Sequence, residues 1–436
     1  MQEIVIVGGG FAGLWATRAL ARADMQITLV DRANHHLFQP LLYQVATAGL
    51  SAPDIAAPLR HIVRDQRNVR VLMSEVSGID VNAKRVELTD GQQLRYDQLL
   101  VASGAAHAYF GHDDWAAHAP GLKTLDDALL IRRRLLLAFE RAEATTDLAE
   151  RQAWLHFAVV GGGPTGVELA GTLAEIAHHT LRHEFRNIDP RLARVRLIEA
   201  GPAVLASFPP KLQERTLQQL EKLGVEVSCG RAVADIKAEG YRLGDDFVPC
   251  RTVLWAAGVA ASPLGKLLVG GRPDLLDRAG RVKVNPDLSL PGHPEVFVAG
   301  DLAGIAQANG KPVPGVAPAA KQMGKFVAAA MRGRQRGATP PPFVYRDFGN
   351  LATIGRMAAV VDLRGVQFSG LPAWWFWLAA HVFFLIGFRN RISVLMNWAW
   401  SYWTYQRSAR IVLGAGDASQ RQAASSVSTS KPSGAR

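Results

Sequence analysis

Two short apolar runs predict the elements around which the rest of the chain is arranged. Residues 4–7 form a continuous β-branched run, and residues 157–160 form a second apolar run. Such runs are typical of strands buried on both faces of a parallel sheet. We expect a helix after each run, over 11–23 and over 167–177, and a further strand after each helix, over 26–30 and over 194–198. The same strand–helix–strand unit is therefore predicted twice.

The junction between strand and helix carries the same glycine spacing in both units. The G-x-G-x-x-G glycines are Gly8, Gly10 and Gly13 in the first unit and Gly161, Gly163 and Gly166 in the second. In such a loop the first glycine allows a tight turn, the second admits a pyrophosphate, and the third allows close helix packing. The following strand ends in an acid each time, Asp31 and then Glu199, as ribose recognition requires. The alternative is a turn in which glycine serves packing only, but this leaves the duplication unexplained.

The segments between and after the two units alternate between strand and loop patterns. Residues 70–76, 78–81, 85–88 and 93–95 alternate like antiparallel strands, and 96–102 reads as a buried strand that ends in Ser103-Gly104. Residues 125–144 form an amphipathic helical pattern. A buried strand over 252–256 closes with Ala257-Gly258. Small residues at these strand ends let a cofactor lie against the backbone.

A later strand, over 296–299, ends in Gly300-Asp301. Asp301 is either an ordinary turn aspartate or a contact to the ribityl or phosphate region of a flavin. The two glycine loops favour the flavin contact. Residues 312–324 are predicted as a proline- and glycine-interrupted entry into a helix over 323–331, and 333–342 as a linker.

The C-terminal region differs in composition from the rest. Residues 371–388 are almost wholly apolar, and six of the ten tryptophans lie between Trp374 and Trp403. The run is followed by Arg389, Arg391, Arg407 and Arg410, with no acid between the first and last of these. A buried core helix, a spanning helix and an interfacial helix are the alternatives. His381 in the middle and the aromatic, basic helix predicted over 392–410 favour the interfacial helix. Residues 415–436 are of low complexity and predicted to be disordered.

Size and charge narrow the possible functions. A chain of 436 residues is expected to form two or three domains, and its net charge of +11 suggests anionic cofactors, an anionic membrane or nucleic acid. We find no nucleic-acid-binding motif. Cys229 and Cys250 form no C-x-x-C pair, which favours a reducing compartment, and the first strand begins too early for a signal peptide.

Together these motifs resemble the type II NADH:quinone oxidoreductases of the two-dinucleotide-binding-domain flavoprotein superfamily. The resemblance extends to about residue 413 and is carried by VIVGGGFAGL, VDRANHHLFQPLLYQVATAGL, VVGGGPTGVELAGTLAE, LWAAGV, VFVAGDLA and GFRNRISVLMNWAWSYWTYQ. It implies FAD as prosthetic group, NADH as exchanged nucleotide and a membrane quinone as acceptor, on the cytoplasmic face of the cell membrane. It also implies an anionic lipid surface as partner and allows a homodimer.

The resemblance implies an α/β fold with two Rossmann-like, glutathione-reductase-like domains and a C-terminal amphipathic helical membrane-binding region. We expect residues 1–115 and 281–340 to form the FAD-binding domain and 116–280 the NADH-binding domain. Residues 341–413 are expected to form the membrane-anchoring region and 414–436 the tail.

The predicted site residues follow from the two loops, the strand ends and the resemblance. For FAD they are Gly8, Gly10, Phe11, Ala12, Gly13, Asp31, Arg32, Ser103, Gly104, Gly300, Asp301, Lys321 and Gln322. For NADH they are Gly161, Gly163, Pro164, Thr165, Gly166, Glu168, Glu199, Ala257 and Gly258. No metal site is expected.

Two residues are predicted to be catalytic. Glu168 is either a carboxylate stabilised by the helix dipole in the first turn or, by resemblance, a group at the nicotinamide–flavin contact that positions NADH or relays protons. Gln322 is predicted at the flavin–quinone boundary. The family pattern A-Q-x-A-x-Q is broken here by Pro318, which puts the quinone contact of the first glutamine in doubt. His35 and His36 are weaker candidates for proton donors to quinone.

Glu199 predicts that the enzyme uses NADH rather than NADPH, because a carboxylate accepts a hydrogen bond from the 2′-hydroxyl of NADH and repels the 2′-phosphate of NADPH. The absence of a cysteine pair separates the chain from disulfide reductases and sulfide:quinone oxidoreductases. Two other functions stay open on the residues alone. One is a flavin-bound NADH sensor or interaction protein, and the other is an NADH-dependent reductase of a soluble electron carrier.

Overall fold

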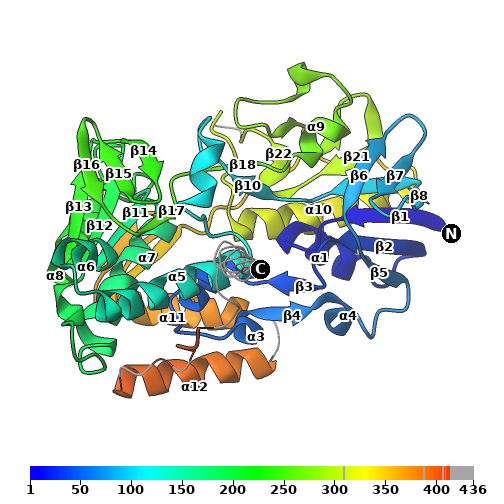
Figure 1. The fold of residues 1–436 in the computed structure, drawn as a ribbon. Helices are drawn as coiled ribbons and strands as arrows, with labels where there is room; N and C mark the ends of the chain where they lie inside the picture. Colours follow the sequence, from blue (N-terminus) through cyan, green and yellow to red (C-terminus); the bar gives the residue numbers. More distant parts are fainter. Residues whose placement is uncertain (308–309, 386–387, 405–406, 408, 413–436) are drawn as a thin grey trace, which may run out of the picture.

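The computed structural model describes residues 1–412 except 308–309, 386–387, 405–406 and 408. Two mainly parallel sheets lie side by side, one formed by early and late segments and the other by the middle of the chain (Figure 1). The predicted disorder of the tail falls outside the described residues.

The first sheet has the strand order β20-β21-β9-β1-β2-β5. Its strands are β1 (Gln2–Val7), β2 (Met25–Asp31), β5 (Val69–Met73), β9 (Gln98–Val101), β20 (Ser289–Leu290) and β21 (His293–Val298). Strand β21 pairs in parallel with β9, so a late segment of the chain completes the sheet that the first glycine loop begins. Helices α1 (Phe11–Ala19) and α10 (Ala317–Gln335) pack against each other beside this sheet.

The second sheet has the order β13-β12-β11-β17, and all of its pairings are parallel. Its strands are β11 (His156–Val160), β12 (Arg194–Glu199), β13 (Val225–Cys229) and β17 (Thr252–Trp255). Helices α5 (Leu125–Ala144), α7 (Pro164–Glu175) and α8 (Pro210–Lys222) accompany it, and α7 continues as a π-helical turn over Ile176–Thr180. The α/β class and the repeated strand–helix–strand unit are confirmed.

Smaller elements join and cover the sheets. Antiparallel sheets are formed by β6 (Val76–Asp80), β7 (Arg85–Leu88) and β8 (Gln93–Arg95), and by β14 (Val233–Lys237), β15 (Gly240–Leu243) and β16 (Asp246–Pro249). Two-stranded pairings join β3 (His35–Leu37) to β4 (Ala56–Pro58), β10 (Ala105–His107) to β18 (Val259–Ala261), and β19 (Val282–Lys283) to β22 (Ala303–Gly304). The short helices include α2 (Leu42–Ala46), α3 (Ala52–Ile55), α4 (Leu59–Ile62), α6 (Leu148–Trp154) and α9 (Leu264–Leu268).

The C-terminal region combines a sheet with two helices. Strands β23 (Asn350–Gly355), β24 (Ala358–Leu363) and β25 (Val366–Ser369) form an antiparallel sheet that the sequence analysis did not predict. Helices α11 (Leu371–Phe384) and α12 (Phe388–Thr404) follow it along the lower edge of the molecule in Figure 1.

One predicted strand pairing and two predicted helix boundaries were wrong. Residues 70–76 were expected in an antiparallel sheet, but β5 pairs in parallel with β2 at the edge of the first sheet. Helix α10 begins at Ala317, six residues before the expected start, because Pro318 occupies its first turn, where a missing N–H costs nothing. The final helix is α12, which begins and ends earlier than the range 392–410.

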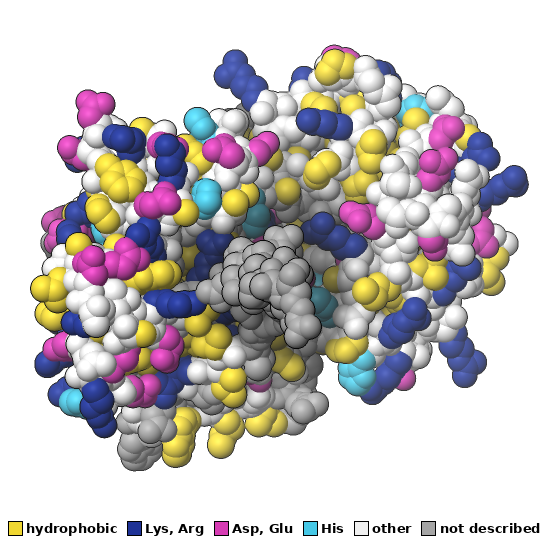
Figure 2. Space-filling model, viewed as in Figure 1, with side chains coloured by type: hydrophobic (Ala, Val, Ile, Leu, Met, Phe, Trp, Pro, Cys, Tyr) yellow, Lys and Arg dark blue, Asp and Glu magenta, His cyan; other side chains and the backbone are white. Residues whose placement is uncertain are grey.

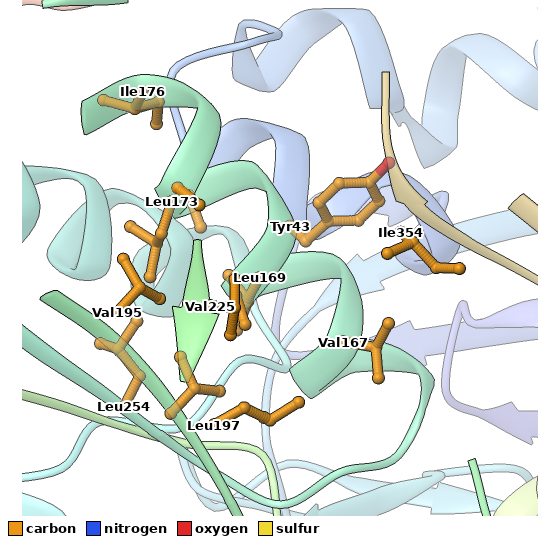
Figure 3. Close-up of a cluster of buried hydrophobic side chains, with 14 of the residues drawn as sticks. Tyr43, Val167, Leu169, Leu173, Ile176, Val195, Leu197, Val225, Leu254 and Ile354 are labelled. Carbon is orange, nitrogen blue, oxygen red and sulfur yellow. The ribbon is translucent and has the colours of Figure 1, made fainter. Parts of the chain in front are cut away.

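One hydrophobic core connects the second sheet to the C-terminal region. Leu169 and Leu173 of α7 pack toward sheet residues such as Val195 and Val225, while Ile354 of β23 lies on another side of the helix (Figure 3). Helix α7 is therefore covered by the sheet and by the C-terminal region.

Candidate functional site

The first glycine loop is shaped for close approach of a ligand. Gly8 has φ +105°, and a Cβ there would lie 2.4 Å from the Ala102 carbonyl oxygen. A Cβ on Gly13 would lie 1.8 Å from the Gly8 carbonyl oxygen, so neither position admits a side chain. Gly10 caps α1 with open space around its Cα, and the first N–H groups of α1 have no acceptor within the helix. The loop thus has the geometry of an anion site at a helix N-terminus.

The second glycine loop repeats this geometry at the N-terminus of α7. Gly161 has φ +110°, a Cβ on Gly166 would lie 1.8 Å from the Gly161 carbonyl oxygen, and Gly163 is an open N-cap. Pro164 occupies the first helical position, where its fixed φ favours the helix. The chain therefore contains two glycine loops of the same construction, each with the geometry of an anion site.

Each loop is held by the acid at the end of the neighbouring strand. Asp31 accepts hydrogen bonds from the Gly9 N–H at 2.5 Å and the Ala33 N–H at 2.7 Å. Glu199 accepts from the Gly162 and Gly201 N–H groups, both at 2.6 Å. A carboxylate has about four acceptor positions, so each acid can hold its loop and still accept from a ribose hydroxyl.

The predicted flavin side of the first site contains an unsatisfied hydroxyl. Ser103 Oγ is buried and has no hydrogen-bond partner within the described residues, as expected of a group that awaits a polar ligand. Gly300 and Asp301 line a cavity with Ala320 and Met323 of α10, and Asp301 lies 3.8 Å from the Lys123 ammonium. The donor-rich loop, the orphaned hydroxyl and this cavity fit a dinucleotide such as FAD.

The remaining predicted residues lie around these two loops. Phe11 and Ala12 begin α1, Arg32 follows Asp31, and Gly104 follows Ser103 with φ +70°. Thr165 is the second residue of α7, while Ala257 and Gly258 follow β17 beside Gly161 and Phe110, respectively. No described residues form a cluster suited to a metal ion.

Gln322 and Lys321 lie on α10 but point to different surroundings. The Gln322 amide donates to the Arg346 carbonyl and accepts from the Arg346 N–H, each at 2.9 Å. Gln322 therefore ties α10 to the chain that leads into the C-terminal sheet. The Lys321 ammonium lies 4.1 Å from the centre of the Trp15 ring. Their predicted roles at a flavin remain predictions.

Glu168 is a buried acid rather than a helix-capping one. It lies in the second turn of α7, so the expected place in the first turn was wrong, and it is only 9% exposed. Burial raises the pKa of its carboxyl well above the usual range, although the Thr353 N–H donates to it. Glu168 is thus a buried acid with a raised pKa, and its Thr353 contact comes from a strand that the sequence analysis did not predict. A buried acid of this kind suits proton relay.

His36 supports the first glycine loop. Its Nδ1 lies 2.9 Å from the Gly9 carbonyl oxygen, and its ring packs edge-on against Phe11. Burial lowers the pKa of His36 to about 4, so the ring is neutral and donates to the loop near pH 7. This position fits a structural role. The neighbouring His35 is half-buried and lies 3.1 Å from the Asn34 side chain.

The C-terminal helices present one packed face and one exposed apolar face. Trp374, Trp377 and His381 of α11 are buried, whereas Trp375 is 58% and Phe383 70% exposed. Burial lowers the pKa of His381 to about 4, with Nδ1 bonded to the Trp377 carbonyl. His381 therefore belongs to the protein core, and the reading of it as a mark of an interfacial face was wrong.

Polar contacts fasten α12 to the body of the protein. The Ser393 hydroxyl and the Asn397 amide donate to Asp54 of α3, at 2.6 and 3.3 Å. The Trp398 indole donates to Gln44 of α2 at 2.7 Å. The opposite face exposes large apolar side chains: Ile392, Leu395, Met396 and Trp400. Hydrophobic side chains lie along the lower edge in Figure 2, where α12 lies in Figure 1.

The C-terminal arginines mostly serve the fold. Arg391 donates to the Leu385 and Phe383 carbonyls at the end of α11. Arg407 pairs with Glu175 at 3.1 Å, and Arg410 pairs with Glu184. The two ion pairs fasten the C-terminal segment to α7 and to the residues after it. The side chain of Arg389 lies outside the described residues. No helix in the described part of the chain is long and apolar enough to cross a membrane.

A second cavity lies where α7, β23, α11 and α12 meet. The sequence analysis did not predict this cavity as a site, although Tyr43 and Gln44 lie within one of the motifs that carry the family resemblance. The cavity is lined by Tyr43, Gln44, Gly49, Thr172, Glu175, Thr180, Thr353, Gly355, Arg356, Trp377, Trp398, Ser401 and Arg407. Thr353 links this cavity to the buried acid, because its N–H donates to the Glu168 carboxyl. The cysteines lie elsewhere as free thiols, and burial raises the pKa of Cys250 to about 12.

Two equivalent glycine-loop sites and a shared core define a protein that binds two dinucleotides, and comparisons with known proteins agree. The pyridine nucleotide-disulphide oxidoreductase family matches residues 2–324, and the NDH2 C-terminal domain matches residues 348–404. The chain is 46% identical over 417 residues to the type II NADH:quinone oxidoreductase Ndh of Mycobacterium tuberculosis, covering 93% of this chain and 89% of the relative. It belongs to the type II NADH:quinone oxidoreductases.

More distant relatives also match nearly the whole chain. The internal alternative NAD(P)H-ubiquinone oxidoreductase A1 of Solanum tuberosum is 30% identical, over 91% of this chain and 85% of the relative. The structure of NDH2 from Plasmodium falciparum in complex with NADH superposes with a TM-score of 0.87 at 20% identity, covering 95% of this chain and all of that one. A sulfide:quinone oxidoreductase from Aquifex aeolicus has a TM-score of 0.71 at 17% identity, covering 90% and 92%. These likenesses extend through the C-terminal region.

Proposed function

We propose that the chain is an FAD-dependent NADH:quinone oxidoreductase that works at a membrane surface. The observation that carries the proposal is the pair of glycine loops, each with its own acid, in a chain of this family. When bound, FAD supplies the two-electron chemistry that connects a nicotinamide to a quinone. The protein contributes binding, orientation and proton handling.

We assign the two nucleotide sites as the sequence predicted them. The loop of Gly8 to Gly13 with Asp31 holds FAD, and the loop of Gly161 to Gly166 with Glu199 holds NADH. Residues 1–115 with 281–340 and residues 116–280 are the corresponding domains, which the return of β21 to the first sheet supports. Glu199 favours NADH over NADPH, because its carboxylate repels a 2′-phosphate.

Glu168 is the proposed proton-relay residue. Its carboxyl is buried and has a raised pKa, and the Thr353 N–H is its contact from β23. An acid of raised pKa can donate a proton near neutral pH. We expect Glu168→Gln, which keeps size and loses the titrating proton, to lower turnover while FAD stays bound. Unchanged turnover and nucleotide affinity would count against this role.

The acceptor is a quinone dissolved in the membrane, and α11 and α12 form the attachment. Their exposed tryptophan, phenylalanine, leucine and methionine side chains support this, because such a face binds the headgroup–acyl boundary. The free cysteines suit the reducing, cytoplasmic side of the cell membrane. A second copy of the chain is a further candidate contact for the same helices.

An anaerobic titration tests the function. NADH is added to the purified holoenzyme and should bleach the flavin absorbance, and a short-chain quinone should restore it. NADPH at equal concentration is the matched control for nucleotide choice, and a soluble electron carrier is the control for the acceptor. Bleaching that a quinone does not reverse, with a long-lived reduced state, would refute quinone reduction and favour an NADH sensor.

A further inference from the structure

Three cations surround a single tryptophan on the surface formed by α1 and α10. The Lys321 ammonium lies 4.1 Å from the centre of the Trp15 ring, and that of Lys325 lies 5.1 Å away. The guanidinium carbon of Arg18 lies 5.2 Å from the same centre. Trp15 and Lys321 are half-buried, whereas Arg18 and Lys325 are exposed. The three charges therefore share one small patch of surface.

This cationic cluster has no carboxylate partner within the described residues. None of its three members forms an ion pair there, although Arg334 and Arg407 elsewhere in the chain each pair with an acid. Burial lowers the pKa of Lys321, and repulsion from Lys325 and Arg18 lowers it further. The Trp15 ring compensates only part of the cost of holding the Lys321 charge beside two other cations, because a cation–π contact is worth about 0.5–2 kcal/mol. An anion would relieve the rest.

The backbone fixes the cluster in place. Helices α1 and α10 touch at Gly324, where a Cβ would lie 2.1 Å from the Ala12 carbonyl oxygen. Trp15 and Arg18 are three residues apart on α1, and Lys321 and Lys325 are four apart on α10, so each pair lies on one face of its helix. The cations are thus presented by two helices in close contact.

The cluster borders the exposed apolar end of α11. The Lys321 ammonium lies 5.1 Å from the centre of the Phe384 ring. Phe384 is 48% exposed and its neighbour Phe383 is 70% exposed. Cationic and aromatic groups thus adjoin at one point, as at the level of lipid headgroups. A free phosphate would use the cations alone, whereas a phospholipid would use both parts.

We propose that Arg18, Lys321 and Lys325 bind the phosphate of an anionic phospholipid headgroup beside Trp15, while Phe383 and Phe384 contact its acyl chains. This inference rests on the proposed membrane attachment and adds a defined headgroup site to it. The site joins α1 and α10, which pack beside the first sheet, to the exposed end of α11, so a bound headgroup fixes how this side of the molecule faces the membrane.

Vesicle sedimentation of the full-length holoenzyme tests the proposal. Wild type, Arg18→Gln and Lys325→Gln are mixed with vesicles of phosphatidylcholine alone or with added phosphatidylglycerol, at low ionic strength. Lys321 stays unchanged because it is also a predicted FAD residue. Lys266→Gln is the control, because Lys266 is an exposed lysine of α9 on the opposite edge of the molecule from α12 (Figure 1).

We expect each cluster variant to bind phosphatidylglycerol vesicles about fivefold more weakly than wild type, since one cation near an anionic surface contributes about a factor of five. Binding to phosphatidylcholine should not change, and Lys266→Gln should match wild type. If Arg18→Gln, Lys325→Gln and Lys266→Gln all lose the same vesicle affinity, the effect is one of overall charge, and the proposed headgroup site is refuted.

Inorganic phosphate at the lipid-phosphate concentration is the competing ligand. If it displaces wild type from phosphatidylglycerol vesicles to the level of the cluster variants, the ligand is free phosphate and the lipid proposal fails. Wild type that sediments with neither vesicle refutes the membrane attachment itself. Wild type that sediments normally, with variants identical to it, refutes only the headgroup site.

Discussion

Replacing Gly171 with alanine tests how the C-terminal sheet is seated on α7. Gly171 lies in the middle of α7, where alanine normally favours the helix by about 1 kcal/mol. A Cβ at this position, however, would lie 1.6 Å from the Ile354 carbonyl oxygen of β23. The intrinsic preference and the tertiary contact therefore predict opposite signs for one substitution.

The structure sets the size of the effect. Ordinary contact begins at 3.4 Å, so β23 must move away from α7 by nearly 2 Å. Ala352 and Ile354 of this strand are fully buried against the helix core, and forcing extra volume into such packing costs about 1–3 kcal/mol. We expect Gly171→Ala to destabilise the protein by up to about 2 kcal/mol after the helical gain is subtracted.

The assay is thermal unfolding of the holoenzyme, followed by circular dichroism and by flavin release. Gly333→Ala is the matched control, because Gly333 also lies in a helix and a Cβ there meets only Ala338, at 3.8 Å. The control should raise the midpoint slightly, and Gly171→Ala should lower it by a few degrees. A rise of equal size in both variants would refute the reasoning.

Three further predictions follow from contacts of single side chains. The Glu199 carboxylate and the 2′-phosphate of NADPH, about 5 Å apart, would repel by about 3 kcal/mol at an effective dielectric constant of 20. The wild type should therefore favour NADH over NADPH by roughly 100-fold in kcat/KM, and Glu199→Gln should narrow that ratio. The same ratio in wild type and variant would remove the role of Glu199. Asp54→Ala should loosen α12, because it removes the hydrogen bonds from Ser393 and Asn397 and leaves that from Trp398 to Gln44. Limited proteolysis should therefore cut this variant faster than Asp65→Ala, whose acid is 91% exposed. The pKa of His381 is about 4 in the folded protein, against an ordinary value of 6.5. Its neutral form therefore stabilises the fold fully above pH 6.5, and this contribution, up to about 3 kcal/mol, is lost as the pH falls to 4. His381→Asn should make the denaturant midpoint fall less steeply between pH 6.5 and 4, and a slope equal to that of the wild type would contradict the burial argument.

Local patterns predicted the parts of the fold that depend on neighbouring residues. The two glycine loops, their strands and α5 follow from short-range requirements, because a tight turn at Gly8 or Gly161 needs positive φ wherever it occurs. The places of Asp31 and Glu199 at strand ends also followed from the sequence. Helix ends were less certain, and the start of α10 was missed because Pro318 was read as an interruption rather than as a first-turn residue.

Contacts between distant segments decided the rest. No local pattern could show that Glu168 would be buried, which raises its pKa, or that the Gln322 amide would bind the Arg346 backbone. The parallel pairing of β5 likewise depends on its partner strand and not on its own alternation. The predicted site residues therefore have definite places, while their roles at a bound nucleotide await the experiments above.

The sequence by itself determined that this chain has two nucleotide loops and an apolar, tryptophan-rich end. Tertiary structure decided which face of that end is exposed, because Trp377 and His381 pack inward while Trp375 and Phe383 remain outside. The physical reason is that glycine spacing acts within one turn of chain, whereas burial is a property of whichever segments come together. An apolar run indicates only that something must cover it, and the fold determines what does.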